Sequence, residues 1–186
     1  MAETVTEQEV PTSAATTGYR AGGIGSHTAP NRGATDSWIT PKWIIDDLGP
    51  FDLDPCQCVP QPWTCATEAY TRDDDGLAMP WTGRVWLNPP YGPATGDWLA
   101  KLADHGKGTA LIFARTETEM FVSWVWKRAT AILFIEGRLY FHHPDGRKAK
   151  GNSGGPSVLV AYGDDDAAAL RASGIRGSFV QGWLAR

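Results

Sequence analysis

Four consecutive residues, Asn88-Pro89-Pro90-Tyr91, have the types and spacing to act on a planar amino group. The side-chain oxygen of Asn88 and the backbone carbonyl of Pro89 can both accept hydrogen bonds from one exocyclic NH2 group. Two such acceptors draw the nitrogen out of conjugation with its ring and leave its lone pair free to attack an electrophile. Tyr91 adds a flat face on which a heterocycle can stack. This stretch favours methylation of an amino group, and the alternative is a proline-rich strand exit without chemistry.

The motif follows the apolar run 85–87, which stops at two prolines. Proline donates no hydrogen bond to a sheet, so the run is expected to be a buried strand that ends there. Ligands of open α/β sheets bind at the carboxyl ends of the strands. Asp54 ends another expected strand, and an acidic turn follows at 73–75. Together these carboxylates suit a cationic ligand at the same edge, although each alone also fits a solvated turn or a helix cap.

Hydrophobic periodicity and turn residues predict alternating helices and strands. Thr40 is expected to cap the first helix and Thr95 the second, while the proline-rich segment 56–65 is expected to be a loop. Helices are predicted over 38–48, 95–102 (stopping at Gly106), 118–129 and 164–172, and strands over 51–54, 66–70, 85–87, 109–114, 131–135, 138–141, 157–162 and 178–184. This order predicts an α/β fold with a mixed, mostly parallel sheet and helices on both faces.

Length and composition indicate a single domain. Residues 1–35 lack periodicity and are expected to form a flexible N-terminal arm, with residues 36–186 as one catalytic domain. The net charge of −4 does not point to a nucleic-acid binder, so any grip on phosphates has to be local. No apolar run approaches the roughly 20 residues of a membrane helix, and no targeting segment is visible. A cytoplasmic protein without a membrane partner is expected.

Three cysteines lie close together in the chain: Cys56, Cys58 and Cys65. An odd number at this spacing favours reduced thiols over a disulfide framework. A zinc site would need a fourth ligand from the four histidines, and the spacing matches no familiar zinc pattern. No metal is expected.

A series of motifs, taken in order, resembles the small phage-encoded Dam-like DNA N6-adenine methyltransferases, which use S-adenosylmethionine (AdoMet). The resemblance covers roughly residues 36–162. It implies a Rossmann-like AdoMet-dependent fold that methylates adenine in DNA. The motifs are Asp36-Ser37-Trp38-Ile39-Thr40-Pro41, Phe51-Asp52-Leu53-Asp54-Pro55-Cys56, Asp75-Gly76-Leu77 with Trp81, Val85 to Tyr91, and Gly137-Arg138-Leu139 with Phe141.

The resemblance also implies roles for individual residues. The catalytic motif corresponds to Asn88, Pro89, Pro90 and Tyr91. The residues implied to bind the cofactor are Thr40 and Pro41 at its methionine end, Asp54 and Pro55 in the first cofactor motif, Asp75 near the adenine of AdoMet, and Glu68 as the acid that binds its ribose. Glu68 is placed only by its position before the acidic turn. One departure is plain, because Pro55 and the cysteine loop stand where most AdoMet enzymes have Gly-x-Gly.

Contact with DNA, expected to be double-stranded, is assigned to a polar loop after Phe141. The loop and its flank concentrate positive charge on Arg138, Arg147, Lys148 and Lys150, beside His142 and His143. Arg115, just past a strand end, is a second candidate. A solvated surface loop without a ligand is the alternative. The sequence leaves the oligomeric state open.

Several other functions stay open at this point. The methyl acceptor could be another amino group: cytosine N4, an RNA base or a protein glutamine. From a different class, the chain could be a non-catalytic nucleic-acid-binding module on the same fold. A metal-binding regulator built on the three cysteines is the most distant alternative.

Overall fold

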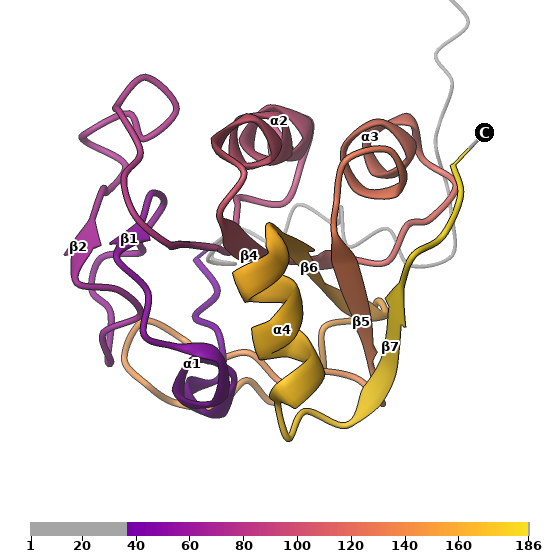
Figure 1. Ribbon diagram of the computed structural model, residues 1–186. Helices are drawn as coiled ribbons and strands as arrows, with labels where there is room; N and C mark the ends of the chain where they lie inside the picture. Colours follow the sequence, from indigo (N-terminus) through magenta and orange to yellow (C-terminus); the bar gives the residue numbers. More distant parts are fainter. Residues whose placement is uncertain (1–36, 186) are drawn as a thin grey trace, which may run out of the picture.

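The computed structural model describes residues 37–185, so the arm predicted over residues 1–35 lies outside the described residues. Residues 37–185 contain one seven-stranded sheet with the strand order β2-β1-β3-β4-β6-β5-β7 (Figure 1). The strands are β1 Leu53–Asp54, β2 Glu68–Ala69, β3 Val85–Leu87, β4 Gly108–Phe113, β5 Ala131–Ile135, β6 Ser157–Tyr162 and β7 Gly177–Gln181.

The sheet is mixed, and the prediction that it is mostly parallel is wrong. The pairings β1–β2, β1–β3 and β3–β4 are parallel, but the longer ladders β4–β6, β5–β6 and β5–β7 are antiparallel. These pairings make β1 to β5 run in one direction and β6 and β7 in the other. The physical reason lies between β5 and β6, where residues 136–156 form no crossover helix. Without one, β6 returns beside β5 in the opposite direction.

Helices cover both faces of the sheet, as predicted (Figure 1). On one face lie α1 (Lys42–Leu48) and α4 (Asp164–Ala172), which bury Leu48 and Leu170 against Leu111 of β4. On the other lie α2 (Thr95–His105), α3 (Glu119–Phe121) and the π-helix η1 (Val122–Trp126). Successive residues of β4 enter the two cores alternately, as a strand buried on both faces requires. None of the helices within residues 37–185 is long and apolar enough to cross a membrane.

Three local predictions are corrected. Thr40 does not cap α1, because Pro41 occupies the N-cap position and no side chain caps the helix. Residues 138–141 do not form the predicted strand. Only His142, which follows them, makes isolated bridges, to Ile39 and to Lys148. The helix predicted over 118–129 starts as expected, where the Thr118 hydroxyl accepts from Phe121 N–H, but then widens into η1. Its apolar pattern does not distinguish an α-turn from a π-turn.

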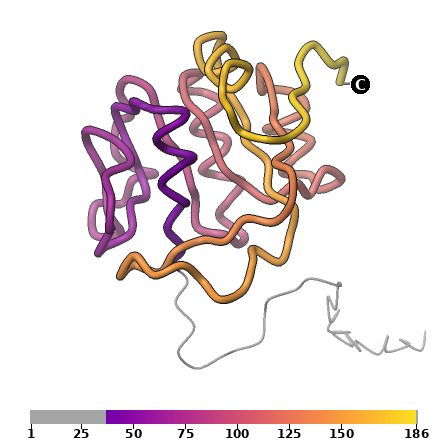
Figure 2. The backbone as a smooth tube through the Cα atoms, turned by 90° about the horizontal axis from the view of Figure 1, so that it is seen from below, coloured from indigo at the N-terminus to yellow at the C-terminus, as the bar shows by residue number. Residues whose placement is uncertain are grey.

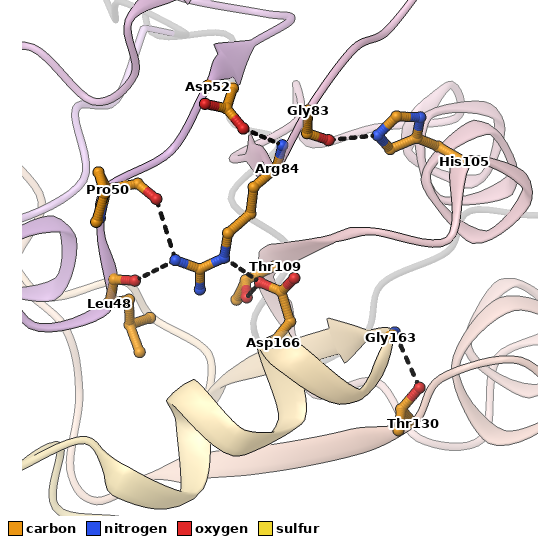
Figure 3. A network of polar contacts seen from close by, with 10 residues as sticks. All are labelled: Leu48, Pro50, Asp52, Gly83, Arg84, His105, Thr109, Thr130, Gly163 and Asp166. Carbon is orange, nitrogen blue, oxygen red and sulfur yellow. Dashed lines mark hydrogen bonds and ion pairs between the residues drawn. The ribbon is translucent and has the colours of Figure 1, made fainter.

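A buried ion pair joins the two halves of the fold at the amino-terminal edge of the sheet (Figure 3). Arg84, just before β3, donates from Nε to Asp166 of α4 at 2.9 Å and from Nη1 to the Leu48 carbonyl at 2.6 Å. The Thr109 hydroxyl donates to the same carboxylate at 2.8 Å. Asp166 is fully buried, and this burial raises the pKa of its carboxyl, although Thr109 and Arg84 oppose the change.

We predict that Arg84→Met destabilises the protein by about 3–5 kcal/mol, because it leaves the Asp166 carboxylate buried without a counter-charge. Arg176→Met is the matched control. Its partner is Glu136 and both side chains are mostly exposed, so the expected loss is below about 1 kcal/mol.

Urea unfolding measures both changes. The double variant Arg84→Met with Asp166→Asn is expected to recover part of the loss, since it removes the stranded charge as well. Equal effects of Arg84→Met and Arg176→Met would show that the buried pair is not a structural anchor.

Candidate active site

A narrow pocket lies at the carboxyl ends of β1 and β3, the edge of the sheet opposite the Arg84 pair. It brings together three residues that the sequence assigned to one site: Thr40, Asp54 and Asn88. Asp54 is the last residue of β1, and Asn88 directly follows β3, so neighbouring parallel strands deliver both side chains to the same place. The remaining lining residues are Trp38, Ile39, Cys56, Cys58, Gln61, Cys65 and Trp86.

The Asn88 side chain is held by one hydrogen bond. Its Nδ2 donates to the backbone carbonyl of Trp38 at 3.0 Å. A carbonyl can only accept, so the amide nitrogen has to face Trp38 and the amide oxygen has to face away. That Oδ1 is buried and has no hydrogen-bond partner among the described residues. Buried acceptors rarely stay unpaired in native proteins, so this oxygen is suited to receive a donor from a ligand.

Two further contacts on the motif were not foreseen from the sequence. The Cys56 thiol donates to the Asn88 carbonyl at 3.3 Å and ties the cysteine loop to the motif. The Trp38 carbonyl holds the Asn88 amide across 50 residues of chain. The sequence carried a weak signal for Trp38, which lies two residues before the assigned Thr40. It carried none for a backbone carbonyl as a partner.

Asp54 is a buried carboxyl with few partners. It is 4% exposed, and its Oδ1 accepts from the Cys56 N–H at 3.1 Å. Burial raises the pKa of Asp54 to about 7, although hydrogen bonds from Cys56 and Gln61 lower it in part. Thr40 lines the same pocket at 2% exposure, and its hydroxyl has no partner among the described residues. The pocket therefore contains polar groups that the fold itself leaves only partly satisfied.

The three cysteines surround this carboxyl as thiols. Burial, and then the charge of Asp54, raise the pKa of Cys65 to about 12 and the pKa of Cys56 above its usual value. Burial also raises the pKa of Cys58. The thiols therefore stay protonated near neutral pH and are poor nucleophiles and metal ligands. Within residues 37–185, no group of three or more His, Cys, Asp or Glu side chains could hold a metal ion.

The rest of the motif is anchored on α2 and β4. The Thr95 hydroxyl donates to the Pro90 carbonyl at 2.9 Å and accepts from the Gly92 N–H at 3.0 Å. Thr95 thus fixes the turn after the motif rather than capping α2, whose N-cap is Ala94. The Tyr91 ring lies 4.5 Å from the Phe113 ring, centroid to centroid, and its burial raises the pKa of the phenol. Pro89 is buried and Pro90 exposed.

The other predicted cofactor residues are positioned differently. Gly76 packs so closely on Pro55 that an added Cβ would lie 1.9 Å from the Pro55 carbonyl oxygen, which places the acidic turn against the end of β1. Asp75 is exposed there with φ +51°, a conformation rare for residues other than glycine. Glu68 is exposed on β2. Pro41 is buried at the start of α1. Neither Glu68 nor Asp75 lines the pocket of Asn88.

The predicted DNA-binding residues lie beside this pocket. Arg147, Lys148 and Lys150 line a groove together with Trp38, whose carbonyl holds Asn88. Arg115 is exposed, with its guanidinium carbon 5.9 Å from the centre of the Phe113 ring that contacts Tyr91. Arg138 is exposed and makes no hydrogen bond or ion pair within residues 37–185. The structure therefore brings most of these cations to the same side as Asn88.

Comparison with known proteins identifies the family. The model of the DNA N-6-adenine-methyltransferase (Dam) family matches residues 25–167, which include α1, β1 to β6 and the whole pocket. No curated protein and no solved structure matches the chain. Because the family model spans most of the sequence, this chain belongs to the Dam family of DNA N-6-adenine methyltransferases.

Proposed function

We propose that this protein transfers the methyl group of AdoMet to the N6 amino group of an adenine turned out of a DNA duplex. The observation that carries the proposal is the unpaired Oδ1 of Asn88, held away from the Trp38 carbonyl. An amino group has two hydrogens to donate, and Asn88 Oδ1 with the Pro89 carbonyl gives it two acceptors. Membership of the Dam family supplies the reaction class.

The polar groups of the pocket suit the amino-acid end of AdoMet. Asp54 offers a carboxylate to an ammonium, and the Thr40 hydroxyl lacks a partner among the described residues. When bound, AdoMet supplies an electrophilic methyl group on a sulfonium. The pocket has a free volume of only about 10 Å³, close to the minimum for one water. It therefore has to widen for the cofactor. Pro41, Pro55, Asp75 and Glu68 are proposed as further cofactor contacts around its rim.

The chain's own residues mainly position the reactants. Asn88 and the Pro89 carbonyl would orient the amino group so that its lone pair faces the methyl group that a bound AdoMet would supply, with the thioether as the leaving group. The proton leaves the nitrogen afterwards, to water or to the Asp54 carboxylate. Tyr91 holds the flipped base, and Pro90 fixes the turn. Unstacking the base costs roughly a few kcal/mol, which the pocket contacts offset.

The strand directions are consistent with a Rossmann-like arrangement. Because β1 to β5 all run the same way, their carboxyl ends share one edge, and the candidate site occupies that edge. We propose on this basis that the domain is a Rossmann-like AdoMet fold with two reversed strands, β6 and β7. In such folds the cofactor lies across the strand ends.

The direct test of function uses purified protein, unmethylated DNA and methyl-labelled AdoMet. After the reaction the DNA is digested and the labelled nucleoside identified by mass. Label in N6-methyl-2′-deoxyadenosine from the DNA is the expected result. Label in N4-methylcytosine, in RNA or in protein would show that the methyl acceptor is not adenine in DNA. AdoMet binding without any methyl transfer would show that the protein is a non-catalytic binding module.

We predict that Asn88→Ala lowers the rate of methyl transfer by about 10²–10³-fold, as is typical when one positioned hydrogen-bonding group is removed from a reacting centre. Cofactor affinity should stay within about twofold, because Asn88 contacts the base and not the methionine end. Stopped reactions and calorimetric titration with AdoMet measure the two effects.

Asn88→Asp gives a sharper version of this test. This variant keeps an acceptor oxygen toward the base. Its second oxygen faces the Trp38 carbonyl and cannot donate to it, so the side chain is held less firmly and an intermediate rate is expected. Methyl transfer by Asn88→Ala at the parent rate would refute the proposed role.

The Asp54 carboxyl makes the stability of the protein depend on pH. The folded protein holds the Asp54 proton up to about pH 7, whereas the unfolded chain releases it near pH 4. Stability therefore falls as the pH rises through this range, by roughly 4 kcal/mol for this group alone. Asp54→Asn removes this charge. It should unfold at higher urea than the parent at pH 8 but not at pH 4.

The same variant should lose the pH dependence of cofactor binding. The affinity of the parent for AdoMet is expected to rise between pH 6 and pH 8, as the carboxylate forms and attracts the ammonium, while Asp54→Asn binds weakly and uniformly. Unchanged urea midpoints of the parent between pH 4 and pH 7 would contradict the raised pKa of Asp54.

A further inference from the structure

A basic groove adjoins the candidate active site. It lies between Trp38 and the loop 143–152 and has a volume of about 440 Å³. Figure 2 shows this loop, in orange, beside the start of the described chain, in indigo. The groove is lined by Trp38, His143, Arg147, Lys148, Ala149, Lys150, Gly151 and Asn152.

The charge of the groove points to an anionic ligand. Arg147, Lys148 and Lys150 are exposed at its rim. The single carboxylate between residues 138 and 156, Asp145, is already paired with Arg147 at 2.7 Å. Lys148 lies over the Tyr140 ring at 4.7 Å, and Lys150 has no ion pair within residues 37–185. In a chain of net charge −4, this local excess of cations is suited to phosphates.

The wall of the groove adds a flat apolar surface. Trp38 is half-buried, and its ring centroid lies 5.3 Å from that of His143 at an interplanar angle of 44°. Ala149 closes the floor between the two lysines, because residues 148, 149 and 150 alternate between exposed and buried. An indole face beside phosphate-binding cations is the combination that nucleic-acid-binding proteins use for a base and its backbone. An acidic peptide would need only the cations.

Backbone hydrogen bonds fix the groove relative to Asn88. Ile39 and His142 exchange two of them, each 2.9 Å long, and His142 also bridges to Lys148. The Trp38 carbonyl, one residue before Ile39, accepts from the Asn88 amide at 3.0 Å. Trp38 therefore has two roles: its side chain forms a wall of the groove, and its backbone carbonyl orients the Asn88 side chain. A nucleotide in the groove lies next to whatever Asn88 holds.

We propose that this groove binds the DNA strand immediately beside the flipped adenine, with Lys148 and Lys150 on backbone phosphates and Trp38 against a flanking base or sugar. The inference rests on the proposed function, and it adds Trp38 to the DNA-contacting residues. It also explains how a chain with negative net charge can hold DNA at one site.

The first test measures binding of the full chain to a fluorescent DNA duplex of mixed sequence at several salt concentrations. Lys148→Gln with Lys150→Gln should weaken binding about tenfold or more and reduce the slope of log K against log salt by about 1.8, or 0.9 for each phosphate. Lys107→Gln with Lys127→Gln removes the same charge from exposed positions before β4 and after η1, and should leave the slope unchanged. Equal slopes in the two double variants would overturn the proposal.

A second measurement tests Trp38. Trp38→Leu should raise the KM for DNA about fivefold or more, as expected from loss of one stacked base, and this rise should exceed any fall in kcat. Trp38→Phe keeps a flat ring and should recover most of the affinity. A fall in kcat with unchanged KM would show that Trp38 acts only by positioning Asn88, and would exclude a stacking contact between Trp38 and the DNA. Competition by polyglutamate as strong as that by DNA would assign the groove to acidic peptides instead.

The outcomes separate this inference from the function on which it rests. Methyl transfer to DNA by the parent, with DNA binding unchanged in the groove variants, would refute the groove alone. Loss of DNA binding in the groove variants, with no methyl transfer by the parent, would support the groove and refute the proposed function.

Discussion

The hydrogen bond from Asn88 Nδ2 to the Trp38 carbonyl is the contact on which the account of the site depends. An asparagine amide presents a donor and an acceptor in two opposite orientations of similar shape. A fixed carbonyl removes this ambiguity, since only the nitrogen can face it. The oxygen is thereby directed away from the protein's own donors, and in the proposed mechanism it is the acceptor that is in place before any substrate arrives. Preorganisation of this kind is how positioned dipoles contribute most to a rate.

The rest of the fold holds the two ends of that contact. Asn88 follows a buried strand at the centre of the parallel part of the sheet, and Trp38 is fixed by the pairing of Ile39 with His142. At the opposite edge, the pair between Arg84 and Asp166 ties β3 to α4 and stabilises the strand that carries the motif. Buried atoms without a partner among residues 37–185 occur at both edges: Thr40 Oγ1 and Asn88 Oδ1 at the carboxyl edge, and Arg84 Nη2 and Asp166 Oδ2 at the other. The difference is that Arg84 and Asp166 neutralise each other, whereas Asp54 at the carboxyl edge has no counter-charge in its pocket.

Most of the elements could be predicted from the sequence, because the central strands β3, β4, β5 and β6 are short, largely apolar runs. The bounds of α4 and the end of α2 at Gly106 also follow from local patterns. The directions of β6 and β7 could not be predicted, because pairing is decided by which strand a segment returns to. The juxtaposition of Asp54 and Asn88 followed from strand order, whereas Thr40 was assigned to the site only through the resemblance to the methyltransferase family. The role of the Trp38 carbonyl could not be predicted. Every residue has a backbone carbonyl, so no residue type in the sequence indicates which one will bind the Asn88 amide.

A crystal structure of the protein with S-adenosylhomocysteine and a methylatable DNA duplex would show directly whether Asn88 Oδ1 accepts from the target amino group. In that complex we expect the target adenine N6 within hydrogen-bond distance of Asn88 Oδ1, about 2.7–3.2 Å, while Nδ2 still donates to the Trp38 carbonyl. An Asn88 amide that turns its oxygen away from the base, or a target base bound elsewhere with Asn88 unchanged, would contradict it.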